Sequence, residues 1–275
     1  MKDRPRLIID TDDDYTLRDF NGDVIVKRCR NLCASNAKIG GNLNASGAKI
    51  SGNLNASGAT IDGYLDAYGA EIGGDLDAYD AEIGGDLNAY GAKISRSLYA
   101  FGAQISGSLY ASGAKISGSL YAFGAKIGGD LYASDAKICG NLNASRAEIS
   151  GNLIVTGATI DRYLDASGAT IGGYLNASRA TIDGVNVTEP TEAEITRLRE
   201  IIRIAEEQPE TFEMSTWHCG TTHCAYGWNQ VLDGMEVDNS TCQEYGRKTL
   251  PSIYHLVFST NDIFLKNVKQ LISTK

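Results

Sequence analysis

The sequence contains little proline and no long apolar run. Only 4 of its 275 residues are Pro, whereas 31 are Gly. Disordered linkers usually carry Pro as well as Gly, so this imbalance indicates tight turns at fixed places. No stretch reaches the about 18 consecutive apolar residues of a membrane-spanning helix, and the chain does not start with the apolar core of a signal peptide. We therefore expect a cytoplasmic protein with no membrane partner, whose six Cys are mostly reduced.

The sequence also has no basic segment. Its formal net charge is −9, and the acidic residues are spread along the chain. Proteins that grip a phosphate backbone concentrate Lys and Arg on one surface or in one segment. We therefore expect no direct binding of nucleic acid. A mildly acidic surface suits a soluble protein or one that meets a basic partner.

What the sequence does contain is an eleven-residue repeat. Leu recurs from Leu32 to Leu175 and Ile follows seven residues later, from Ile39 to Ile182, in 14 copies without exception. Ala stands two and five residues after each Leu, with Val155 as the one substitute. This alternation places the apolar side chains on one side of an extended chain. Gly or another turn residue falls twice in every repeat, which excludes a helical coiled coil with the same period.

The turn residues predict two short strands and two corners per repeat. The position two residues after Ile is Gly in most copies, with Arg96 and Arg162 as exceptions. Gly, Asn and Asp tolerate left-handed backbone angles, whereas Arg does so less readily. We therefore expect local adjustment of the backbone where Arg stands at a corner. The position four residues after Leu holds Gly or one of five other residues: Asn36, Asp80, Asp135, Arg146 and Arg179.

The length of the repeat constrains the size of one coil. Eleven extended residues give a perimeter of roughly 36 Å, which leaves little room for Leu and Ile between sheets about 10 Å apart. Two repeats give roughly 73 Å, or about 18 Å for each of four sides. We therefore favour a mainly β protein, a four-sided parallel β-helix with 22 residues per coil and about seven coils. One repeat per coil, giving a rod about twice as long, is the alternative.

Two families share parts of this pattern. The segments AKISG, ATIDG and AEIGG resemble the A-x-L-x-x unit of pentapeptide-repeat proteins, although here five-residue and six-residue units alternate. The segment GNLNASGAKI resembles strand pairs of bactofilins, the polymer-forming bacterial cytoskeletal β-helices, but their third side is missing. The resemblance covers residues 31–187 and implies a right-handed parallel β-helix with small and large residues inside.

The repeat divides the chain into three parts. Residues 1–30 are an N-terminal cap, with short strands expected over LIID and DVIVKRC; residues 31–187 are the β-helix; and residues 188–275 are a small helical domain. The first helix of that domain is expected in VTEPTEAEITRLREIIRIAEEQ, capped by Thr191 or Thr188. Its apolar stripe comprises Ile195, Leu198, Ile201, Ile202 and Ala205. Further helices are expected over CAYGWNQVL, TLPSIYHLVF and NDIFLKNVKQLIS.

Aromatic and acidic residues gather in the outward columns of the middle coils. Stacked rings stabilise a sheet face, and Tyr is also enriched at protein interfaces, so both roles are open. The candidate partner-binding residues are Tyr68, Tyr79, Tyr90, Tyr99, Phe101, Tyr110, Tyr121, Phe123 and Tyr132, with Asp66, Asp75, Asp77 and Asp86 beside them.

The densest polar chemistry lies in the segment WHCGTTHCAYGW. His218, Cys219, His223 and Cys224 are candidate zinc ligands, with Cys242 and His255 in reserve. A disulfide and a thiol–base pair are alternatives. We favour packing of these residues in a small core, and so expect no cofactor. The segment resembles a W-x-C-G-T-x-H-C-x-x-G-W signature of small phage and bacterial domains, which implies a phage or prophage origin.

These features favour a non-enzymatic scaffold that binds a protein partner. In a phage setting the scaffold would inhibit a host enzyme or a defence complex. The alternatives are a self-assembling structural β-helix, an acidic DNA mimic that inhibits an enzyme such as gyrase, and an enzyme that uses Cys219 or Cys224. Homo-oligomerisation is left open by the sequence.

Overall fold

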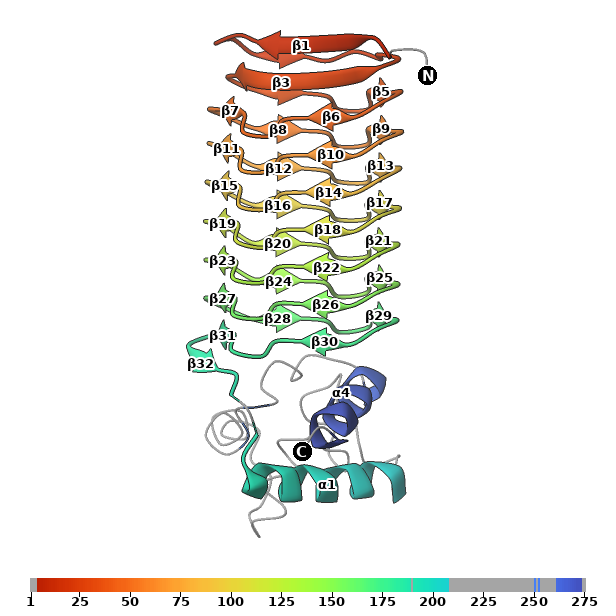
Figure 1. The fold of residues 1–275 in the computed structure, drawn as a ribbon, viewed down its shortest axis with the longest axis vertical. Coiled ribbons are helices and arrows are strands. Elements are labelled where there is room, and N and C mark those ends of the chain that lie inside the picture. Colours follow the sequence, from red (N-terminus) through yellow and green to blue (C-terminus); the bar gives the residue numbers. More distant parts are fainter. Residues whose placement is uncertain (1–3, 189, 208–249, 251, 253–260, 274–275) are drawn as a thin grey trace.

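The fold is a rod of stacked coils followed by helices (Figure 1). The computed structural model describes residues 4–188, 190–207, 250, 252 and 261–273. Each strand of the rod pairs in parallel with the strand 22 residues further on, as Leu65 does with Leu87 and Leu87 with Leu109. One coil therefore holds two repeats, as predicted, and the alternative of one repeat per coil is wrong.

The chain passes along four faces in each coil, and we number the faces in chain order. Faces 1 and 3 carry the repeat Leu residues and lie opposite each other; faces 2 and 4 carry the repeat Ile residues. Face 1 comprises β2 (Tyr15–Thr16), β4 (Leu32–Cys33), β8 (Leu54–Asn55), β12 (Leu76–Asp77), β16 (Leu98–Tyr99), β20 (Leu120–Tyr121), β24 (Leu142–Asn143) and β28 (Leu164–Asp165). Face 2 comprises β5 (Lys38–Ile39), β9 (Thr60–Ile61), β13 (Glu82–Ile83), β17 (Gln104–Ile105), β21 (Lys126–Ile127), β25 (Glu148–Ile149) and β29 (Thr170–Ile171).

The other two faces are joined into one sheet by a longer strand near the N-terminus. Face 3 comprises β6 (Leu43–Asn44), β10 (Leu65–Asp66), β14 (Leu87–Asn88), β18 (Leu109–Tyr110), β22 (Leu131–Tyr132), β26 (Leu153–Ile154) and β30 (Leu175–Asn176). Face 4 comprises β7 (Lys49–Ile50), β11 (Glu71–Ile72), β15 (Lys93–Ile94), β19 (Lys115–Ile116), β23 (Lys137–Ile138), β27 (Thr159–Ile160) and β31 (Thr181–Ile182).

The N-terminal residues form both of the strands expected there. Strand β3 (Asp23–Cys29) runs along both face 3 and face 4, and β1 (Arg6–Asp10) pairs with it in parallel. Strand β2 starts face 1, so this face has eight strands although the repeats supply seven. The cap is therefore a further, irregular turn of the same solenoid.

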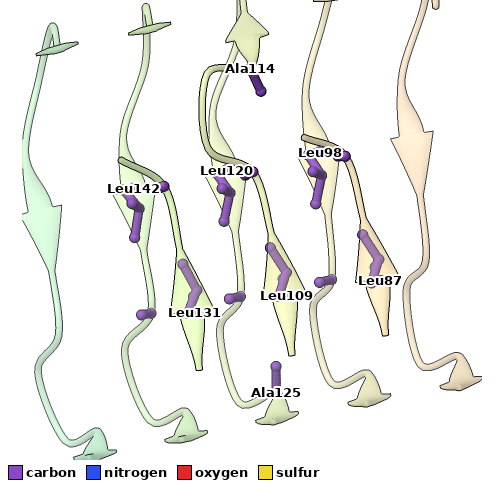
Figure 2. Close-up of a cluster of buried hydrophobic side chains, with 14 of the residues drawn as sticks. Leu87, Leu98, Leu109, Ala114, Leu120, Ala125, Leu131 and Leu142 are labelled. Atoms are coloured by element: carbon purple, nitrogen blue, oxygen red, sulfur yellow. The ribbon is translucent and has the colours of Figure 1, made fainter. Parts of the chain in front are cut away.

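The interior is made of columns of identical side chains. No repeat Leu is more than 3% exposed, and no repeat Ile more than 9%. Figure 2 shows Leu98, Leu120 and Leu142 in one column beside a second column of Leu residues. Fully burying one such side chain contributes about 1.5–3 kcal/mol, so each coil adds a similar increment to the free energy of unfolding.

The corners follow one backbone pattern. The residue four positions after Leu has a positive φ in every repeat from Asn36 to Arg179. Arg146 and Arg179 have φ of 56° and 58°, the same conformation that Gly adopts elsewhere in the column. The expected local adjustment at these two Arg corners is therefore wrong. Their N–H groups donate to Ser167 and Val187 carbonyls over 2.8 and 3.0 Å, and such bonds hold the chain in this conformation.

The C-terminal end of the rod is closed by a hairpin and two helices. Strand β32 (Val185–Asn186) pairs antiparallel with β31. Helix α1 (Glu192–Glu207) starts with a capping box, in which the Glu194 N–H donates to Thr191 Oγ1 and the Thr191 N–H donates to Glu194 Oε2. Its predicted apolar stripe is buried, and α4 (Asn261–Ser273) forms where the last helix was expected. Neither of these helices is both long and apolar enough to cross a bilayer.

The predicted helices over CAYGWNQVL and most of TLPSIYHLVF lie outside the described residues. Of the latter segment only Leu250 and Ser252 are described, and both are buried.

Candidate binding surface

The aromatic residues lie on two opposite faces of the rod. Successive repeats alternate between faces 1 and 3, so neighbours in space are 22 residues apart and not 11. The single patch suggested by the sequence is therefore two separate groups. Face 1 carries Tyr79, Tyr99, Phe101, Tyr121 and Phe123, and face 3 carries Tyr68, Tyr90, Tyr110 and Tyr132.

The rings of face 1 form two stacks in adjacent outward columns, and we call the two stacks together the aromatic block. Phe101 stacks between Tyr79 and Phe123, with centroid distances of 5.1 and 4.8 Å. In the adjacent outward column Tyr99 stacks on Tyr121 at 5.3 Å. The Arg146 guanidinium lies 5.5 Å from the Phe123 centroid and ends the stack with a cation–π contact. The aromatic block thus comprises five rings over three adjacent coils.

The rings of face 3 form two separate pairs. Tyr68 stacks on Tyr90 at 5.5 Å and Tyr110 on Tyr132 at 5.2 Å, but the two pairs occupy different outward columns. The Tyr132 hydroxyl donates to Asp130 Oδ2 over 2.6 Å, and this bond raises the pKa of Tyr132 to about 12. One hydroxyl of this face is therefore already engaged within the chain.

The four candidate acids support the backbone of the coils. Asp66 and Asp77 accept the N–H of the residue two positions later, each over 2.9 Å. Asp75 and Asp86 accept the N–H of the residue 22 positions later, over 2.9 and 2.8 Å. Asp75 and Asp77 lie on face 1, whereas Asp66 and Asp86 lie on face 3. The four carboxylates therefore do not form one acidic stripe.

Asp75 and Asp86 belong to a ladder of polar side chains that we did not predict from the sequence. The residue before each repeat Leu is usually Asn, Asp or Ser, and its side-chain oxygen accepts a backbone N–H from the next coil. The sequence does show a column of short side chains that can accept a hydrogen bond. Their role as acceptors becomes clear only once residues 22 positions apart are known to be neighbours. The acceptors are Asn31, Asn42, Asn53, Asp75, Asp86, Ser97, Ser108, Ser119, Asp130, Asn141 and Asn152.

Face 4 carries a row of lysines between the two aromatic faces. Lys115 lies directly between Lys93 and Lys137 in the sheet register, and all three are exposed. Lys93 is paired with Glu71 over 2.8 Å, and Lys49 precedes Glu71 in the same column. A shallow depression of about 450 Å³ is lined in part by Lys49, Glu71 and Lys93. Like charges at neighbouring strand positions are destabilising, so folding does not explain this row.

The candidate zinc ligands His218, Cys219, His223 and Cys224 lie outside the described residues. Within the described part of the chain, no group of three or more His, Cys, Asp and Glu side chains could hold a metal ion. Cys29 is a buried free thiol there, and Cys33 and Cys139 are exposed free thiols.

Comparison of the chain with protein families, with curated proteins and with solved structures gives no match. The repeats show a parallel β-solenoid, but neither the pentapeptide-repeat family nor the bactofilins are shown to include this chain.

Proposed function

We propose that the protein is a non-enzymatic scaffold that binds a protein partner through the aromatic block of face 1. The observation that carries this proposal is that five rings, in two stacks, gather on one face of the rod over three adjacent coils. Interface hot spots are clusters of Tyr, Trp and Arg that a partner can desolvate together. The stacked rings also stabilise the sheet, but ring pairs contribute only about 0.2–1 kcal/mol each.

The lysine row gives the partner a second property. Lys93 and Lys115 lie on face 4, and from each of them the chain turns one corner to reach Tyr99 or Tyr121 on face 1. A partner seated on the aromatic block would thus meet Lys93, Lys115 and Lys137 at the rim. Charges at a rim steer association, and their effect falls as the salt concentration rises. We therefore propose a partner with an acidic surface beside its apolar contact.

In cellular terms, we propose a host enzyme or a defence complex as the partner and inhibition as the outcome. The support is the resemblance of residues 217–228 to a signature of small phage and bacterial domains. Membership of a pentapeptide-repeat-like family and a cytoplasmic location belong to the same proposal. The DNA-mimic alternative gains no support, because the four candidate acids are split between faces 1 and 3.

The test compares two matched double variants as baits in a bacterial lysate. Tyr99→Asn/Tyr121→Asn removes two rings from face 1, and Tyr110→Asn/Tyr132→Asn removes two rings from face 3. Asn occupies the same columns in other coils, as Asn143 and Asn88 do, and accepts a backbone N–H there. Both variants should therefore fold. The face 1 variant should bind the partner at least about 30-fold more weakly, which corresponds to about 2 kcal/mol.

The face 3 variant should retain the affinity of the wild type. Lys115→Glu should mainly slow association at low salt, in line with a role at the rim. Equal affinity of wild type and face 1 variant for the recovered protein, measured in titrations with the purified partner, would refute the proposal.

A further inference from the structure

Among the residues that the structure describes, the first strand of the rod pairs along one edge only. Strand β1 pairs on one side with β3, where the Asp23 N–H donates to the Pro5 carbonyl and the Thr11 N–H donates to the Arg28 carbonyl. Alternate residues of a strand direct their N–H and C=O groups to opposite edges. The backbone groups of Arg6, Ile8 and Asp10 are therefore directed away from β3.

The side chains along this edge are arranged symmetrically about Ile8. Arg6 stands two residues before it and Asp10 two residues after it, and all three are exposed, Ile8 to 56%. Arg4 and Asp12 extend the same order of charges by one step on each side. Leu7 and Ile9 point toward the interior, where Ile9 is buried and Leu7 is only partly buried.

We propose that two copies of the chain associate head to head through an antiparallel β1–β1′ pair centred on Ile8. In this register Ile8 faces Ile8 of the second copy, and Arg6 faces Asp10. Each facing pair has its backbone groups at the free edge, so it can exchange two N–H···O bonds. The same register places Leu7 opposite Ile9, which extends the apolar interior from one rod into the next.

Charge complementarity is what selects a second copy as the occupant. A segment that carries bases at one end and acids at the other is complementary to itself only in the antiparallel direction. Arg28 lies 3.4 Å from Asp10 and 3.0 Å from Asp12, but these two carboxylate side chains stay 47% and 80% exposed. Asp14, in contrast, is held by Arg30 and Asn31, whose hydrogen bonds lower the pKa of Asp14 to about 2. Asp10 and Asp12 are therefore exposed carboxylates on the outer side of this edge that can meet a second chain.

The test is a set of charge reversals followed by sedimentation of the full chain over a range of concentrations. The wild type should sediment as a dimer. Arg6→Asp places acids at both positions 6 and 10, and Asp10→Arg places bases at both, so each variant alone should be monomeric. Their equimolar mixture should form a heterodimer, and the double variant Arg6→Asp/Asp10→Arg should dimerise again.

Two further measurements locate the interface. The Ile8 amide should exchange with solvent at least about tenfold more slowly in the dimer than in the monomeric variants, because it gains a hydrogen bond. Far-UV circular dichroism should show that each variant is folded like the wild type, since all changed side chains are exposed. A monomeric wild type at every concentration, or single reversals that dimerise as the wild type does, would overturn the proposal. Neither result bears on the aromatic block of face 1, so the two proposals are tested independently.

Discussion

A left-handed backbone at one position of every repeat turns the chain from a Leu strand into an Ile strand. At Gly113 φ is 65°, and apart from Gly113 itself and its two chain neighbours no heavy atom lies within 4 Å of the place where a Cβ would stand. The second Gly column has a different cause, since a Cβ on Gly118 would lie 2.3 Å from Ser97 Oγ of the coil before. One column is therefore selected by backbone angle and the other by close approach.

Substitution of Gly113 isolates the effect of the backbone angle. Gly113→Ala should lower the free energy of unfolding by about 1–2 kcal/mol, because L-residues with a Cβ are disfavoured in the left-handed region. Gly113→Asn should cost less, since Asn36 adopts a φ of 57° at the equivalent corner. Denaturant unfolding of the three proteins checks this order. Equal losses for Ala and Asn would show that the backbone angle is not the cause.

At the scale of elements, helix α4 closes the C-terminal end of the rod. At the C-terminal end, the Leu175 N–H would meet the carbonyl of a following coil, and Asn267 Oδ1 of α4 accepts it instead over 3.0 Å. The neighbouring Lys266 Nζ donates to the Gly172 carbonyl over 2.7 Å. Helix α4 thus offers an acceptor to a free donor and a donor to a free acceptor. Such partners satisfy the backbone groups that a solenoid leaves open at its last coil.

Removal of the Asn267 side-chain acceptor should show how much the last coil depends on α4. Asn267→Ala leaves the buried Leu175 N–H without its partner, which should cost about 1–3 kcal/mol. Hydrogen exchange of the Leu175 amide should accelerate, and the free energy of unfolding should fall. The matched control is Lys269→Ala, which breaks an exposed pair with Glu206 and should cost at most about 1 kcal/mol. An unchanged exchange rate in Asn267→Ala would contradict the capping role.

The elements differ in how far the sequence predicted them. The Leu and Ile columns, the two strands per repeat and helix α1 follow from strict spacing, because each depends on residues close in the chain. The placement of Tyr110 and Tyr121 on opposite faces does not, because it depends on which repeats become neighbours. The contact of Asn267 with Leu175 joins residues 92 positions apart, and no local pattern marks it.

At the scale of the whole molecule, the strands of each repeat coil pair with those of the neighbouring coils. Buried residues of every coil are nearly the same, so coils should be removable in units of 22 residues. Units of 11 residues would also preserve the Leu and Ile columns, but they would exchange faces 1 and 3 beyond the deletion. The number of preceding repeats thus determines on which face of the rod an outward side chain lies.

Deletion of residues 141–162 should leave a folded protein. This deletion removes one coil outside the aromatic block and rejoins Gly140 to Tyr163, which keeps each downstream strand on its own face. The far-UV circular dichroism per residue should be unchanged, and the unfolding midpoint should be slightly lower. A deletion of residues 141–157 is the control, because it joins two Ile strands without a Leu strand between them. If both deletions unfold the chain, stability does not reside in independent coils.

The uniform interior has a consequence for how the chain finds its native pairing. A strand such as β18 could pair with any Leu strand of its face and make the same buried contacts. The core alone therefore does not determine which coils become neighbours. Only the features that differ from coil to coil, such as the Phe101–Phe123 stack and the irregular segments at the two ends of the rod, distinguish the correct neighbouring strand from an incorrect one. These outer residues therefore specify the correct strand register during folding. A variant that lacks them should be prone to kinetic traps in which strands pair with the wrong coil and whole coils are left out.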